Sequence, residues 1–333
     1  MILRLDIARF KSIRELSLEC RRVNVFVGPP DTGKTNVLEA LHLLSLFGWD
    51  WPIGASLRLR EELGFDPLFY RQFFDEPIRI ELTLDPPMRG GAHLSFKLGI
   101  SGQQRLLSIE SQFLRGVEIP FNASLPIPSL AWLRYYSYAG SEAWQYATGY
   151  PEGTQVITPP HGANLAYIAR HNAKAYDYLK DIVASLGWKL RFDQNLKVFR
   201  MSEVRENEIL DYNLDLLSDS LKRLFFYATI LRTSENATLV FDEPDVFAFP
   251  PYPKTLGDLI AADESNQYFL STHNPYFLGS LVEKTAAKHL AVFVCSRDEE
   301  GGTTARLVPP TRMNLIVEHG ANVFFNLDEL LEP

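Results

Sequence analysis

The chain has 333 residues, and 46% of them are hydrophobic, which is enough to build one large domain or two ordinary ones around a sizeable core. Its formal net charge of −8 argues against a molecule that binds nucleic acid or anionic membranes through its overall charge. Two cysteines are too few for a disulfide framework, no stretch approaches the roughly 20 apolar residues that span a bilayer, and charges interrupt the opening apolar residues, so we expect a cytoplasmic protein without membrane contact.

The start of the chain predicts β-structure around one glycine-bounded loop. Residues 2–8, 14–20 and 23–27 alternate or run apolar, which predicts three strands. Residues 35–44 carry apolar side chains at helical spacing and predict a helix. Between the third strand and this helix lies Gly28–Thr35, which fits the pattern G-x-x-x-x-G-K-[ST].

A strand, a glycine-bounded loop and a helix N-terminus together make a phosphate cradle, in which backbone N–H groups contact phosphate oxygens. Lys34 is expected to reach the β- and γ-phosphates as a catalytic residue, and the Thr35 hydroxyl to ligate Mg²⁺. The loop therefore predicts ATP and Mg²⁺ as ligands. The residues predicted to bind the nucleotide here are Gly28, Pro29, Pro30, Asp31, Thr32, Gly33, Lys34, Thr35 and Asn36.

The middle of the chain predicts two further substructures. Residues 78–84 alternate strictly, and with the looser segments after them they predict an antiparallel β subdomain over residues 78–111. Residues 163–186 have helical spacing, so residues 160–215 are interpreted as a helical insertion. Without repeats or a low-complexity linker, residues 1–333 are expected to form one domain.

A second helix, predicted over residues 218–231, is followed by a buried strand that ends in two carboxylates, Asp242 and Glu243. Strands often end in acidic residues, so this pattern is weak by itself. Downstream of a phosphate loop, a strand that ends in two carboxylates supplies the groups that Mg²⁺ binding and the activation of water require. Asp242 is expected to hold the magnesium shell, and Glu243 to polarise the water that attacks the γ-phosphate.

Two more polar groups stand at the ends of predicted elements. The predicted strand 267–271 leads into His273, which therefore lies at the carboxyl end of a strand, where ligands bind in open α/β sheets. At this position His273 is expected to donate a hydrogen bond to the γ-phosphate or to the attacking water. A lone histidine is also common as a turn or core residue. Ser218 suits an ordinary helix N-cap, or a contact with the γ-phosphate of a nucleotide held by a second subunit.

In their order, these motifs resemble the ABC-type ATPases, in particular the SMC-related group of AAA-family ATP-binding proteins that includes the overcoming-lysogenization-defect proteins. The resemblance implies an α/β P-loop NTPase fold with a mixed central sheet, and a homodimer that encloses two nucleotides. It also implies an effector protein or nucleic acid as partner. The segments that carry it are residues 7–13, 25–41, 67–71, 77–82, 162–165, 217–220 (the signature), 241–244 (the Walker B segment) and 271–275.

The chain departs from the pattern of this group at several positions. Pro30 replaces an Asn and removes a backbone donor from the loop. Ser220 stands in the signature where Gly is usual, and Asp245–Pro250 replaces the usual E-x-x-L-H-P after the Walker B segment. Gln72 is a candidate for the glutamine that contacts Mg²⁺ in many relatives. These changes leave the coupling of dimerisation to hydrolysis open.

The first hypothesis is an ATPase that dimerises head to tail and hands a conformational change to a partner or nucleic acid, in DNA repair or defence. The alternative is a nucleotide-gated binding module that hydrolyses little or no ATP, which the altered signature and loop favour. A transporter subunit fits less well, because the signature is not clean. The aromatic run from Trp132 to Tyr146 is interpreted either as core packing or as a surface that stacks on bases.

Overall fold

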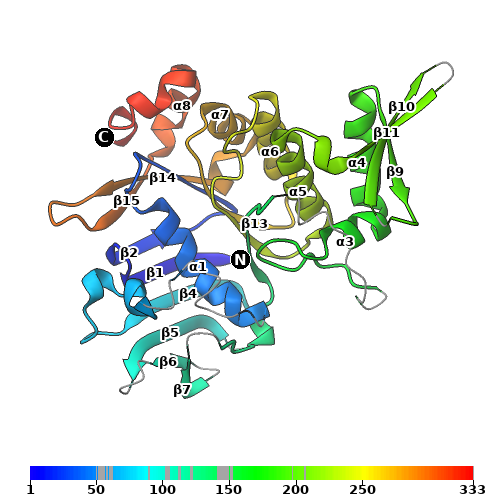
Figure 1. Ribbon diagram of the computed structural model, residues 1–333. Helices are drawn as coiled ribbons and strands as arrows, with labels where there is room; N and C mark the ends of the chain where they lie inside the picture. Colours follow the sequence, from blue (N-terminus) through cyan, green and yellow to red (C-terminus); the bar gives the residue numbers. More distant parts are fainter. Residues whose placement is uncertain are drawn as a thin grey trace.

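A computed structural model describes residues 1–49, 51, 57, 59, 63–88, 91–101, 106–111, 114–120, 123–140, 150, 153–196, 198–205 and 208–332. Its elements form layers (Figure 1). No helix of the described residues is long and apolar enough to cross a membrane. The helices are α1 (Lys34–Trp49), α3 (Leu165–His171), α4 (Ala173–Ser185), α5 (Asp219–Thr233), α6 (Pro251–Ala262), α7 (Pro275–Lys284) and α8 (Met313–His319).

The central sheet is mixed and has six strands in the order β15-β14-β3-β13-β12-β8. Five of them are parallel, and β15 pairs antiparallel with β14. The carboxyl ends of β3, β12, β13 and β14 therefore lie at one edge, where ligands bind in such sheets. The strands are β3 (Val23–Val27), β8 (Leu133–Tyr136), β12 (Thr238–Phe241), β13 (Gln267–Ser271), β14 (Leu290–Arg297) and β15 (Thr303–Leu307).

The second sheet is antiparallel, with the order β2-β1-β4-β5-β6-β7. The predicted subdomain 78–111 is thus part of a larger sheet, since β4 pairs with β1, β1 pairs with β2, and the sheet continues to Ile119. In the pairing of β1 with β4, for instance, Leu5 lies opposite Leu82. The strands are β1 (Ile2–Phe10), β2 (Ile13–Glu19), β4 (Ile78–Met88), β5 (Gly91–Ser101), β6 (Leu106–Ser111) and β7 (Leu114–Ile119).

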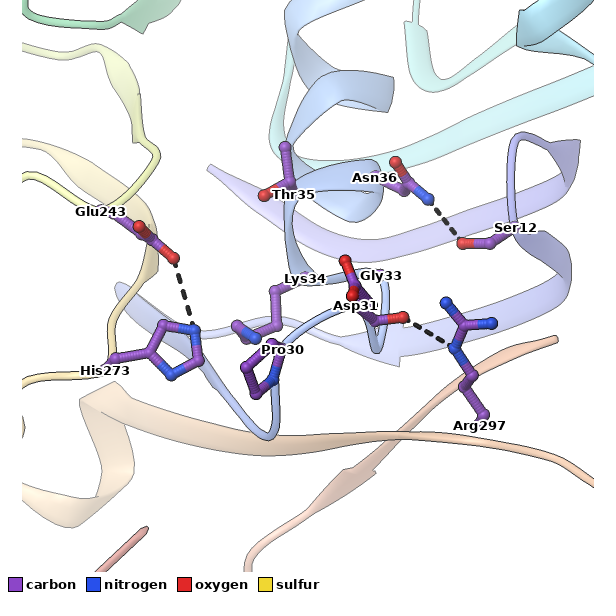
Figure 2. A pocket seen from close by; sticks show the side chains of 10 residues that line it. All are labelled: Ser12, Pro30, Asp31, Gly33, Lys34, Thr35, Asn36, Glu243, His273 and Arg297. Atoms are coloured by element: carbon purple, nitrogen blue, oxygen red, sulfur yellow. Dashed lines mark hydrogen bonds and ion pairs between the residues drawn. The ribbon is translucent and has the colours of Figure 1, made fainter. Parts of the chain in front are cut away.

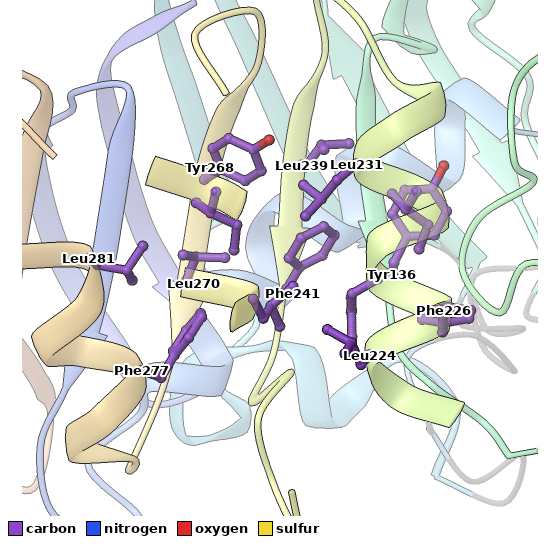
Figure 3. Packing of buried hydrophobic residues seen from close by; sticks show 14 of the residues in the cluster. Tyr136, Leu224, Phe226, Leu231, Leu239, Phe241, Tyr268, Leu270, Phe277 and Leu281 are labelled. Carbon is purple, nitrogen blue, oxygen red and sulfur yellow. The ribbon is translucent and has the colours of Figure 1, made fainter. Parts of the chain in front are cut away.

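Helix α1 lies between these two sheets (Figure 1). Its buried side chains, among them Leu41 and Phe47, pack against residues of both sheets in one apolar cluster. On the opposite face of the central sheet, α5, α6 and α7 pack in a second cluster. Figure 3 shows Tyr136 of β8 beside Phe226 of α5, and Leu270 of β13 beside Phe277 of α7. The P-loop NTPase fold, with its mixed central sheet, is confirmed.

The insertion over residues 160–215 corrects one expectation, because its α-helices lie only in its first half. Asn172 interrupts the predicted long helix, and its side chain accepts a hydrogen bond from Ala175 N at the start of α4. After Gly187 the chain forms a three-stranded antiparallel sheet, β11-β10-β9. The strands are β9 (Lys189–Asp193), β10 (Val198–Arg205) and β11 (Glu208–Asn213).

Candidate functional site

The phosphate loop joins the end of β3 to the start of α1, as its sequence predicts. Gly33 has φ +92°, and a Cβ there would overlap the Thr303 hydroxyl and lie 2.9 Å from Ser12 Oγ. Both the backbone conformation and the close approach of these two hydroxyls therefore require glycine.

Replacing Gly33 by Ala is expected to weaken ATP binding at least about ten-fold and to cost about 1–3 kcal/mol of stability, because strain and overlap add at this position. Gly187→Ala is the matched control, since Gly187 has φ +83° with nothing within 4 Å of the place that a Cβ would take. Isothermal titration with Mg-ATP and urea unfolding measure both effects. Equal behaviour of the two variants would show that the loop tolerates a side chain at Gly33.

Lys34 is held inside the loop by the loop's own carbonyls. Its Nζ atom donates to Gly28 O (3.0 Å) and to Pro29 O (2.8 Å). Burial lowers the pKa of the ammonium group, and the nearby carboxylates of Asp31, Asp242 and Glu243 oppose this effect. The charge of Lys34 thus lies at the floor of the loop, where phosphate oxygens are expected.

The second half of the site meets the first at the edge of the central sheet. The Thr35 hydroxyl donates to Asp242 Oδ1 (3.3 Å), and Ser271 Oγ donates to the same carboxylate oxygen. A hydroxyl beside a carboxylate offers the hard oxygen ligands that Mg²⁺ prefers. Within the described residues no group of three or more His, Cys, Asp and Glu gathers as a metal site.

The side chains of Glu243 and His273 face one another at this edge of the central sheet (Figure 2), with 3.4 Å between Glu243 Oε1 and His273 Nε2. Partial burial, together with the positive charge of Lys34, lowers the pKa of His273, and the carboxylates of Glu243 and Asp242 act against this. The backbone of Glu243 has φ +46°, a conformation that non-glycine residues rarely adopt and that is concentrated at functional sites.

One cavity of about 360 Å³ brings Lys34 and Thr35 together with Glu243 and His273 (Figure 2), while Asp242 does not line it. The residues of the loop and the residues of the two strand ends are about 200 positions apart in the sequence, yet they line the same space. It is lined by Ser12, Pro30, Asp31, Gly33, Lys34, Thr35, Asn36, Glu243, His273 and Arg297.

Two residues of the cavity were missed by reasoning from the sequence. Ser12 accepts a hydrogen bond from Asn36 Nδ2 (2.5 Å) and lies 2.6 Å from Thr303 Oγ1. Arg297, at the end of β14, donates from Nε to Asp31 O (2.7 Å). Its position at the carboxyl end of a parallel strand was the one signal that pointed to it.

Other predicted residues lie outside the cavity. Ser218 caps α5, its Oγ atom accepting a hydrogen bond from Leu221 N (3.4 Å), so its N-cap interpretation is confirmed. Gln72 ends a short 3₁₀ turn and does not line the cavity. Gly28, Pro29 and Thr32 belong to the loop but do not line the cavity. The Thr32 hydroxyl donates to Pro29 O within the loop (2.9 Å).

The described part of the aromatic run packs in the interior. Tyr136 is fully buried and, like Tyr138, lies against Phe226, while Tyr135 stacks on His42. This supports core packing for these residues. Trp144 and Tyr146 lie outside the described residues.

Comparison with known proteins identifies the fold. No protein-family model and no curated protein sequence matches the chain. Among solved structures, the chain is similar to an Smc head bound to the C-terminal winged-helix domain of ScpA, with a TM-score of 0.59 and 13% identity over 92% of this chain and 97% of that one. It is also similar to an Smc head domain with an extended coiled coil, bound to the C-terminal domain of ScpA from Pyrococcus furiosus, with a TM-score of 0.58 and 13% identity over 96% and 98%. The chain thus has the fold of an SMC head domain.

Proposed function

We propose that this protein is a Mg²⁺-dependent ATPase of the ABC type. The observation that carries the proposal is the meeting of Lys34 and Thr35 with Glu243 and His273 in one cavity. A phosphate cradle alone would fit any P-loop protein. The carboxylate of Glu243 and the imidazole of His273, paired in the same cavity, add the groups that favour attack by water on the γ-phosphate.

Each residue has a distinct role in this reaction. The loop N–H groups and Lys34 bind the β- and γ-phosphates and stabilise the charge that grows there. Thr35 and Asp242 hold Mg²⁺, which neutralises charge on the phosphate oxygens when it is bound. Glu243 accepts the proton of the attacking water, and His273 orients that water or donates to the γ-phosphate.

The proposal includes a head-to-tail homodimer. Ser218 is absent from the cavity of its own chain, and its exposed position at the start of α5 leaves it free to meet a nucleotide held by a second copy. Exposed apolar side chains surround this region: Phe247 is 85% exposed, Phe249 64% and Leu216 72%. Such a grouping of large apolar side chains is typical of an interaction surface.

The wider role is proposed at the level of class alone. The resemblance to the overcoming-lysogenization-defect proteins favours a role in DNA repair or defence, with an effector protein or nucleic acid receiving the conformational change. The two similar Smc heads are bound to domains of ScpA, which supports a protein partner for this chain as well.

Phosphate release from Mg-ATP tests the proposed activity. Lys34→Ala is expected to lower the rate about 100-fold, because it removes the charge that binds the transferred phosphoryl group. Lys180→Ala, an exposed lysine on α4, is the control and is expected to match wild type. ATP binding without phosphate release in wild type would instead support the nucleotide-gated binding module.

A further inference from the structure

Two departures from the pattern of the ABC-type ATPases lie in contact with each other. The Ser220 hydroxyl, at the signature position where glycine is usual, donates to Phe247 O (3.2 Å) and accepts from Phe249 N (3.0 Å). Both partners belong to residues 242–250, which we call the β12–α6 loop. The side chain that glycine lacks therefore holds the loop whose sequence is also unusual.

The β12–α6 loop is bound at its other end to the catalytic edge of the sheet. Glu243 N donates to Ser271 Oγ (2.9 Å), and the Thr272 hydroxyl donates to Asp245 Oδ2 (2.8 Å). Ser271 and Thr272 directly precede His273. The first part of the loop is thus fixed to the segment that carries the histidine of the site.

Hydrogen bonds within the loop connect these two ends. Val246 N donates to Glu243 O (3.3 Å), and Ala248 N donates to Asp245 O (3.2 Å). The path from the Ser220 hydroxyl to the backbone of Glu243 is therefore a series of short turns. These bonds connect the first turn of α5 to the backbone of Glu243.

The apex of the loop needs this support. Phe247 has φ +57° and Glu243 φ +46°, each a strained conformation for a non-glycine residue. Phe247 and Phe249 are mostly exposed, so their side chains supply little packing to hold the backbone. Ser220 is the described side chain that bonds the backbone on both sides of Ala248.

We propose that Ser220 is a positioning residue for hydrolysis, tying the β12–α6 loop to the first turn of α5 so that contact at α5 sets the position of Glu243. This proposal rests on the proposed function, because α5 also carries Ser218, the group expected to meet the partner's nucleotide. In this arrangement the Ser220 hydroxyl is bonded within its own chain.

Hydrogen exchange tests the contact without any need for activity. The Phe249 amide donates to the hydroxyl, so Ser220→Ala is expected to speed its exchange about ten-fold, as the loss of one hydrogen bond implies. Ser220→Thr keeps the hydroxyl and is expected to restore protection. Thr255→Val is the matched control, since its hydroxyl bonds to Pro251 O within α6 and not to the loop. Unchanged exchange at Phe249 in Ser220→Ala would overturn the proposal.

Kinetics and the titration of His273 test the positioning. Ser220→Ala is expected to lower kcat about ten-fold with KM within two-fold of wild type, and Ser220→Thr to recover it. The His273 imidazole, followed by NMR, is expected to titrate at a lower pH in Ser220→Ala, because the carboxylate of Glu243 raises its pKa alongside Asp242 and against Lys34.

The outcomes separate this proposal from the proposed function. If wild type releases phosphate and Ser220→Ala retains both kcat and the His273 titration, positioning by Ser220 is overturned while the ATPase stands. If wild type releases no phosphate, the ATPase fails. A shifted His273 titration with faster Phe249 exchange then still supports the connection between α5 and Glu243, and unchanged values contradict it.

Discussion

Replacing Glu243 by Gln is expected to lower ATP turnover at least about 100-fold while ATP binding is retained. The carboxylate lies 3.4 Å from His273 and lines the cavity beside Lys34 and Thr35, so it is placed to accept the proton of an attacking water. A positioned general base contributes about 10²–10⁴-fold to such reactions. Glutamine has the same size without the basicity, which leaves the cavity shape and the loop unchanged.

The same variant is expected to accumulate an ATP-bound dimer, because hydrolysis is the step that would open it. Light scattering with Mg-ATP would show a doubled mass for Glu243→Gln and a smaller, transient increase for wild type. Glu264→Gln, at an exposed position after α6, is the control and is expected to behave as wild type. A variant that turns over at the wild-type rate would remove Glu243 from the mechanism.

Replacing Asp245 by Asn is expected to change how stability depends on pH. Burial raises the pKa of Asp245 from 3.8 to about 7, and the carboxylate of Glu243 adds to this, while the hydrogen bond from Thr272 opposes it. Its Oδ1 atom has no hydrogen-bond partner among the described residues. A charge in this place is poorly compensated, so the native state favours the protonated form.

The sign of the effect follows from proton binding. Between about pH 4 and pH 7 the native state holds a proton that the unfolded chain has released, so wild-type stability falls as the pH rises through this window. Asparagine has no such proton. The difference in unfolding free energy between Asp245→Asn and wild type is expected to grow by about 4 kcal/mol from pH 4 to pH 8, in favour of the variant.

Urea unfolding of both proteins at a series of pH values measures this difference. Asp181→Asn, on the exposed face of α4, is the control and is expected to show a difference that does not vary with pH. A constant difference for Asp245→Asn as well would mean that Asp245 is ionised in the folded protein across the whole range.

Most residues that line the cavity were predictable because their signals are local. The glycine-bounded loop follows one buried strand, and Asp242 and His273 follow two others. In the structure β13 pairs in parallel with both β3 and β12, so the carboxyl ends of the three strands lie at one edge, where these groups were expected to converge.

The parts that sequence reasoning missed depend on contacts between distant segments. Ser12 and Thr303 are 291 positions apart and meet through a bond from Thr303 N to Ser12 O and a contact between their hydroxyls, and no pattern in either segment shows it. The strands after Gly187 were missed for a different reason. Most of β11 is half-exposed or exposed, so it lacks the apolar alternation that identifies a strand.

The two departures in Ser220 and Asp245–Pro250 illustrate a further limit. In the sequence, each departure alters a segment that the resemblance identifies as functional, and no pattern indicates that Ser220 contacts residues 245–250. Only the fold places the Ser220 hydroxyl between Phe247 O and Phe249 N. Two substitutions that are separate in the sequence thus form a single connection in three dimensions.

A crystal structure of Glu243→Gln with Mg-ATP tests the central claim most directly. We predict the γ-phosphate at Lys34, Mg²⁺ between Thr35 and Asp242, and a second copy that brings the partner's Ser218 to the same phosphate. A nucleotide bound away from Lys34, or held by a monomer whose Ser218 faces solvent, would contradict it.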